Sequence, residues 1–257
     1  MTKDVFNQER FRAYVAKLWA EQKRFAMTFC LILAGLIFAA ELFAVFTCYH
    51  VPSYAVDNNM PAEDPIRNGI VVECLLLLFA GGCIAASRML ADGQQKAGRI
   101  HVLTQPVSMF ENWLARVLIF VVGYFVAFHA IYYGFELVRV AIFSPVFPQS
   151  HISVQHLFSF AGSSDMFFPA LFYSTVAYAF FVSFYTLGCF VFPRRPLLAT
   201  TVALFCIGIA LLFILLLYAD PSEFFMEVMF VWGALLAGCN FWLSYRRLRE
   251  LEIIDRM

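Results

Sequence analysis

The sequence carries little charge, and the charges it has cancel. Only 14% of its 257 residues are Asp, Glu, Lys or Arg, against about 25% in ordinary soluble domains, and the formal net charge is zero. A nucleic-acid-binding protein that relies on basic charge is therefore excluded. A disordered chain is excluded too, because 62% of the residues are hydrophobic. A soluble domain of this size could not bury so many apolar side chains, so the composition predicts a protein that crosses the bilayer several times.

Motifs for catalysis and nucleotide binding are also missing. The sequence contains no GxxxxGK[ST], HExxH, GxSxG or CxxC, so it cannot hold a nucleotide in a P-loop of its own. We predict no enzymatic activity, no catalytic residue, no cofactor and no metal, with any energy source in another subunit or an ion gradient. A zinc site at His151, His156 and Asp165 is disfavoured, because the two histidines are too far apart in sequence to share one helical face.

Six apolar segments reach the length of about 20 residues that a membrane-crossing helix needs. They are predicted at 25–48, 69–90, 114–138, 168–192, 197–218 and 225–245. Of the 18 basic residues, 16 fall on one side of the membrane in this arrangement, and only Arg67 and Arg139 fall on the other. Because basic residues favour the cytoplasmic side, we predict an all-α, multi-pass protein of the cell (inner, cytoplasmic) membrane with both termini cytoplasmic.

The predicted organisation has three parts. Residues 1–24 form a cytoplasmic amphipathic helix in the membrane interface, because apolar side chains recur on one helical face; the alternative is an ordinary solvated cytoplasmic helix. Residues 25–245 form the six-helix transmembrane domain, with a cytoplasmic loop at about 92–113 and an outer segment at about 144–167, and residues 246–257 form a cytoplasmic tail. The apolar face of the first helix consists of Phe11, Tyr14, Val15, Leu18 and Trp19.

The cytoplasmic loop carries local helix signals. Asp92-Gly93 is typical of a helix end. Ser108 followed by Glu111 is a capping box, in which each side chain bonds the backbone N–H of the other residue, so a new helix is predicted to begin near Met109. Between these signals, Ile100 and Leu103 are apolar residues one helical turn apart.

The order of residues in this loop resembles the loop between the second and third spans of ABC-2-type transporter permeases. Gly98 matches the glycine of that family, Pro106-Val107-Ser108 matches its Pro-Val-Ser, and Ala115-Arg116 stands for its Gly-Lys. The sequence departs from the family where Lys96-Ala97 replaces an acidic residue and Arg99 replaces a threonine. The chain is thus similar to a compact, divergent member.

The resemblance implies a function and partners. In the family this loop forms a coupling helix that docks on a separate cytoplasmic ATPase subunit, and two permease chains pair as a homodimer or heterodimer. The chain would then be the membrane-spanning subunit that moves a substrate, still unknown, across the bilayer. The residues implied in ATPase coupling are Gly98, Ile100, Leu103, Pro106, Val107, Ser108 and Glu111.

Ionisable residues inside the predicted spans are the candidates for a substrate or ion path. Such residues usually face the interior of a helix bundle, because a charge at mid-bilayer is costly. Their alternative role is structural: the carboxylates pair with Arg67 or Arg139 or stay hydrated, and the histidine bonds a neighbouring helix, as do Asn240 and Ser244. The candidates are Glu41, Glu73, His129, Glu136 and Glu227.

Two other classes of function fit the same composition. One is a membrane scaffold or accessory protein without a transport path. The other is an intramembrane enzyme built on the glutamates and His129, which the absence of a convergent nucleophile disfavours. Copurification of a P-loop ATPase would separate the permease from both.

Overall fold

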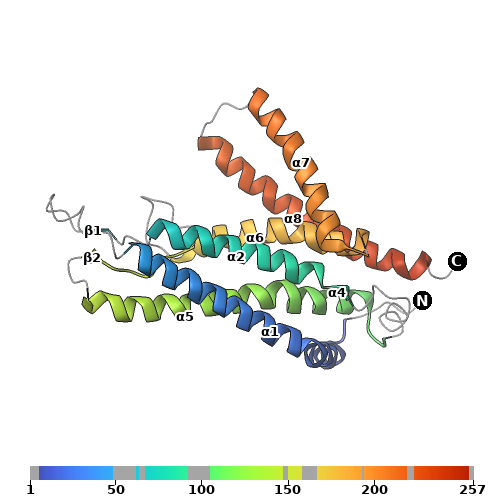
Figure 1. Cartoon of the computed structure of the whole chain (residues 1–257). Helices are drawn as coiled ribbons and strands as arrows, with labels where there is room; N and C mark the ends of the chain where they lie inside the picture. Colours follow the sequence, from blue (N-terminus) through green and yellow to red (C-terminus); the bar gives the residue numbers. More distant parts are fainter. Residues whose placement is uncertain are drawn as a thin grey trace. The chain divides into compact units, whose positions relative to one another are not determined.

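The structure is a computed structural model that describes residues 6–48, 62–63, 67–91, 105–146, 150–157, 167–192, 194–218 and 223–254. This part of the chain is almost entirely helical, with one pair of two-residue strands (Figure 1). The elements are α1 (Gln8–Cys48), β1 (Ala62–Glu63), α2 (Arg67–Ser87), α4 (Met109–Val117), the π-helix η3 (Leu118–Val122), α5 (Gly123–Val146), β2 (Ser150–His151), α6 (Phe167–Val191), α7 (Pro196–Tyr218) and α8 (Glu223–Ile254).

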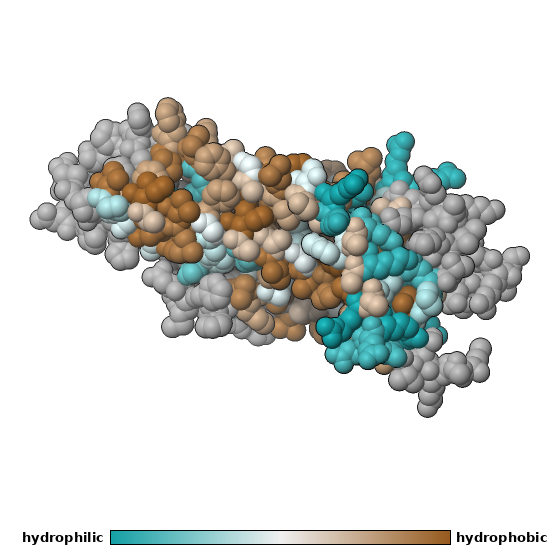
Figure 2. Space-filling model, turned by 90° about the horizontal axis from the view of Figure 1, so that it is seen from below, coloured by the Kyte–Doolittle hydropathy of each residue, from teal (hydrophilic) through white to brown (hydrophobic). Residues whose placement is uncertain are grey.

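Three helical stretches of the described residues are long and apolar enough to cross a membrane. They are Gln8–Phe46, Met109–Val146 and Leu171–Val191. Two shorter apolar helices, Val71–Ser87 and Pro196–Ile209, lie below that length within the described residues. Hydrophobic side chains cover much of the face seen in Figure 2. The helical class and the membrane location are therefore confirmed, while the six spans and the sidedness of the termini stay predictions.

Two helix boundaries bear on the predicted organisation. Helix α1 is assigned without interruption from Gln8 to Cys48, so the amphipathic segment and the first predicted span belong to one helix. The helix that carries the third predicted span begins at Met109, as the capping box predicts, and continues through η3 and α5 to Val146.

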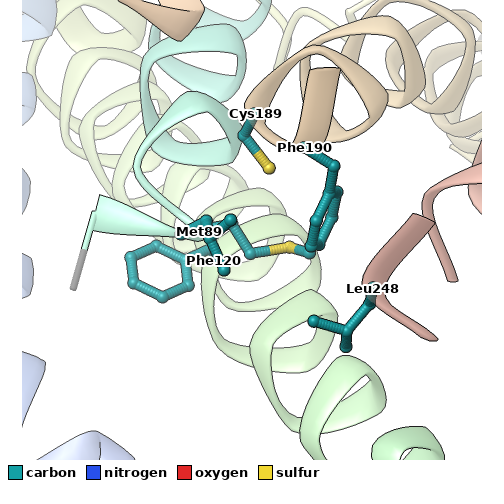
Figure 3. Close-up of a cluster of buried hydrophobic side chains, with 6 residues drawn as sticks. Met89, Phe120, Cys189, Phe190 and Leu248 are labelled. Carbon is teal, nitrogen blue, oxygen red and sulfur yellow. The ribbon is translucent and has the colours of Figure 1, made fainter. Parts of the chain in front are cut away.

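The chain forms two compact units, and the first contains residues 1–21, 82–124 and 176–257. A hydrophobic cluster in this unit joins the end of α2 to η3, α6 and α8 (Figure 3). Glycine permits close packing beside it, because a Cβ at Gly82 would overlap the ring of Tyr178 and a Cβ at Gly188 would overlap Thr200. The cluster consists of Met89, Leu90, Phe120, Cys189, Phe190 and Leu248.

Polar side chains connect the helices of this first unit. Asn240 of α8 donates a hydrogen bond to Ser183 of α6 at 3.1 Å, and Trp113 of α4 donates to Ser244 of α8 at 2.9 Å. Asn240 and Ser244 thus have the helix–helix role expected of polar residues in spans. The Tyr178 hydroxyl donates to the Val121 carbonyl at 2.9 Å. Val121 lies in η3, where the wider π turn disturbs the regular α-helical bonding.

The second unit contains residues 22–81 and 125–175. It holds the later part of α1, most of α2, most of α5 and the beginning of α6. The strands pair in parallel, with Ala62 opposite Ser150 and Glu63 opposite His151. Its interior contains Leu33, Ile37, Cys74, Leu78, Phe128 and Tyr132, each at most 4% exposed. The six cysteines whose side chains the structure describes, in both units, are free of disulfides.

Candidate functional site

The head of α4 has a completely formed cap. The Ser108 hydroxyl accepts a hydrogen bond from the Glu111 backbone N–H at 3.2 Å, and the Glu111 carboxylate accepts one from the Ser108 N–H at 2.9 Å. Both side chains are buried. The capping box therefore satisfies two backbone donors that would otherwise have no partner at the start of the helix.

The Glu111 carboxylate also binds the start of α1. It accepts a hydrogen bond from the Asn7 backbone N–H at 2.8 Å and two from the Arg10 guanidinium, at 2.8 Å from Nε and 2.9 Å from the terminal nitrogen. Burial by itself would raise the pKa of Glu111, but the bonds from Arg10, Asn7 and Ser108 outweigh burial and lower this pKa to about 2. Glu111 precedes the apolar run of the third predicted span, and it is ionised at any physiological pH.

The apolar face of the N-terminal helix packs against the chain itself. Tyr14 and Leu18 are 5% and 1% exposed, and they form a cluster with Ala115 of α4. The Tyr14 hydroxyl donates to the Asn112 side-chain oxygen at 2.9 Å. Trp19, in contrast, is 52% exposed. Most of the face predicted to lie on the membrane is therefore covered by protein, because α4 offers it an apolar partner.

A buried arginine strengthens the same junction. Arg116 is 1% exposed, and its guanidinium donates to the Asn112 side-chain oxygen at 2.8 Å and to the Met89 carbonyl at 2.6 Å. Asn112 thus accepts from both Tyr14 and Arg116. The start of α1, the head of α4 and the end of α2 are joined by one hydrogen-bonded network.

The structure separates the residues expected at the coupling loop into two groups. Ser108 and Glu111 are buried and fully engaged, so they hold the helix head in place and offer no contact surface. Pro106 is exposed and Val107 is half-buried. Gly98, Ile100 and Leu103 lie outside the described residues.

An exposed aromatic pair lies at the head of α4. Phe6 and Phe110 are 46% and 43% exposed, and their ring centroids are 6.4 Å apart. The Phe110 ring also contacts Trp113 and Tyr245, at centroid distances of 6.3 and 6.0 Å. Apolar rings supported in this way on a rigid frame are suited to contact with another protein.

The second candidate site is a buried cluster of charges in the other unit. The Arg139 guanidinium donates to both carboxylate oxygens of Glu136, at 3.3 and 2.9 Å, and its Nε lies 3.9 Å from a Glu41 oxygen. Glu136, Arg139 and Glu41 are 0%, 4% and 7% exposed. The structure thus brings two of the predicted glutamates together through Arg139, which agrees with the structural alternative of carboxylates paired with an arginine.

This cluster also holds the segment between α5 and α6. Glu136 accepts a hydrogen bond from the Gln155 backbone N–H at 3.1 Å, and Arg139 donates to the Ser153 carbonyl at 3.1 Å. The Tyr132 hydroxyl donates to the Gln155 carbonyl at 2.9 Å. The segment is thus bonded to three successive turns of one face of α5.

The remaining candidates are His129, Glu73 and Glu227. His129 lies about two turns before Glu136 on α5, and its Nδ1 is 2.9 Å from the Phe125 carbonyl of the preceding turn, a bond within one helix. Glu73 is half-buried on α2. The side chain of Glu227 lies outside the described residues. Among the side chains that the structure describes, no three His, Cys, Asp or Glu residues are grouped to hold a metal ion.

The sequence does not reveal the contacts of several residues in the two candidate sites. The Arg139–Glu136 pair can be predicted, because the two residues are three apart on a helix. The contacts of Arg10 and Tyr14 with α4 and those of Gln155 with α5 join distant parts of the chain, and only the folded structure reveals them.

Comparisons with known proteins give no relative: no family model, no curated protein and no solved structure matches this chain.

Proposed function

We propose that the chain is the membrane-spanning permease subunit of an ABC-2-like transporter, powered by a separate cytoplasmic ATPase subunit. In this proposal the protein has six spans with both termini in the cytoplasm, lies in the inner membrane, and works as a dimer of permease chains. The loop resemblance at Pro106-Val107-Ser108 and the placement of basic residues support it.

The observation that carries the proposal is the frame around Glu111. One carboxylate joins the cap of α4 to the start of α1 through four hydrogen bonds. A helix head that transmits force from a docked ATPase must be held firmly, and these bonds attach the head of α4 to the start of α1. Phe110 and Pro106, which are close to Glu111 in the sequence, are both exposed.

The proposed coupling surface therefore differs from the set of residues that the sequence suggests. Ser108 and Glu111 act as positioning residues, and the ATPase contact is made by Pro106 and Phe110 together with the loop that carries Ile100 and Leu103. An apolar groove on the ATPase is the expected counterpart, since all four side chains are apolar.

The experiment is a pull-down of the ATPase from membranes that contain Phe110→Asp or the double variant Ile100→Asp/Leu103→Asp. Both place charge in an apolar contact, where an unpaired buried charge is costly, so we expect normal membrane levels and lost ATPase association. Phe192→Asp is the matched control, because Phe192 is similarly exposed, at 38%, beside another predicted cytoplasmic turn. Retention of the ATPase by both test variants at the level of the control would refute docking at this head.

A further inference from the structure

Near the end of α8, two arginines lie over aromatic rings. The Arg246 guanidinium carbon lies 4.6 Å from the centroid of the Trp242 ring, and that of Arg249 lies 6.0 Å from the Tyr245 ring. Each pair is separated by four residues, so the two pairs lie on neighbouring turns of the helix. Both arginines are exposed, and Trp242 is 54% exposed.

Stacking on a ring leaves the guanidinium edge accessible. Each guanidinium carbon lies over an aromatic ring within the range of a cation–π contact. The N–H groups of a guanidinium lie in its own plane and form a fork that matches phosphate oxygens. Because the ring restricts the rotamers of each arginine, less conformational entropy is lost when a phosphate binds. The two arginines are thus prepared donors for an anionic group.

The position of Arg246 and Arg249 on α8 indicates which anionic group they bind. Exposed apolar side chains precede them on α8, including Leu235, Leu236 and Leu243, at 58%, 44% and 40% exposed. Such side chains face lipid tails in a membrane protein, and tryptophan is enriched at the level of the headgroups. Arg246 follows Trp242 by one turn, about 6 Å along the helix, so a Trp242 ring at the level of the headgroups brings Arg246 near the lipid phosphates.

The neighbouring Arg247 is already occupied. Its guanidinium donates to the Glu250 carboxylate at 2.9 Å. Among the described residues, no carboxylate forms an ion pair with Arg246 or Arg249. The three arginines therefore have equal formal charge but differ in their capacity to bind an external anion.

We propose that Arg246 and Arg249 bind the headgroup phosphate of an anionic phospholipid, with Trp242 and Tyr245 holding the two guanidinium groups. The site belongs to α8 alone, so it does not depend on the ATPase or on transport. The lipid is a resident of the bilayer and contacts the apolar face of α8 with its acyl chains.

Native mass spectrometry of the detergent-solubilised full chain tests this proposal. The protein is titrated with dioleoyl-phosphatidylglycerol, with dioleoyl-phosphatidylcholine and with inorganic phosphate. We expect tighter binding of phosphatidylglycerol than of phosphatidylcholine, and no displacement of the lipid by millimolar phosphate. Each arginine near an anionic surface is worth about fivefold in affinity, so Arg246→Gln/Arg249→Gln binds phosphatidylglycerol about 30-fold more weakly.

Arg247→Gln is the control for the single variants Arg246→Gln and Arg249→Gln, because each of the three loses one positive charge, and Arg247 is engaged with Glu250. We expect it to lose less affinity for phosphatidylglycerol than either single variant. Circular dichroism verifies that each variant is folded, and the single variants, each about fivefold weaker, replace the double variant if it fails to fold. Wild-type binding by the arginine variants would overturn the proposal, as would an equal loss in Arg247→Gln. Equal affinity for both lipids, or full displacement by phosphate, would overturn the assignment to an anionic lipid.

Discussion

Removal of the Glu111 carboxylate should release the N-terminal helix from α4. The Glu111→Ala change takes away the acceptor of Asn7, Ser108 and Arg10. Removal of one partner from a buried charge pair costs about 3–5 kcal/mol. Because the Arg10 side chain is 38% exposed and hydrates when freed, the lower end applies, about 3 kcal/mol. In a domain of this size that lowers Tm by roughly 6–12 °C.

Thermal unfolding in detergent, followed by tryptophan fluorescence, measures this loss. The matched control is Glu9→Ala, because Glu9 is an exposed acid in the first turn of the same helix and lies near the same end of the unit. Trypsin provides a second reading, since the variant should be cut faster within residues 10–17 than the control. Equal unfolding temperatures and equal cleavage of the two variants would refute the role of Glu111 in holding the start of α1 to α4.

A second substitution of this residue, Glu111→Gln, has a predictable pH dependence. The folded pKa of Glu111 is lowered from 4.5 to about 2, so its ionic contribution is fully present above pH 4.5 and is lost as the pH falls toward 2. The difference in stability between wild type and Glu111→Gln should therefore be constant from pH 8 down to about 5. It should shrink in more acidic solution, and a difference that grows on acidification would contradict the assigned sign.

Two further predictions concern the second charge cluster and a glycine. Glu136→Ala should free the segment 152–157, seen as faster amide hydrogen exchange there, because Glu136 accepts from Gln155 and pairs with Arg139; unchanged exchange would contradict this. Gly82→Leu should destabilise the protein by about 1–3 kcal/mol through overpacking, because a Cβ at Gly82 would already overlap Tyr178. Gly134→Leu is the control, because a Cβ at Gly134 would meet no other atom within 4 Å. Equal unfolding temperatures of the two variants would show that the close approach at Gly82 is not needed.

Local features of the fold can be predicted from sequence because they depend on neighbouring residues. The start of α4 at Met109 follows from Ser108 and Glu111, which are three residues apart and bond each other across one turn. The apolar helices follow from their composition in the same way. The pairing of Arg139 with Glu136 is also local, since one helical turn separates them.

Contacts between distant residues could not be predicted, and they define both sites. Glu111 has a second role because Arg10, 101 positions earlier in the chain, lies beside it in the fold. The face of Tyr14 and Leu18 shows the limit most clearly. An apolar stripe indicates only that a helix face avoids water, and the same pattern fits a lipid surface or another helix. The structure shows that α4 covers it.

The composition of the complex in native membranes tests the central claim most directly. The tagged full chain is purified in mild detergent from the membranes of its source, and the copurifying proteins are quantified by mass spectrometry. The permease account predicts a P-loop ATPase in amounts equal to the chain, together with ATP hydrolysis by the purified complex. Purification of the chain with no nucleotide-binding subunit, under conditions that preserve a known permease–ATPase pair, would contradict the account.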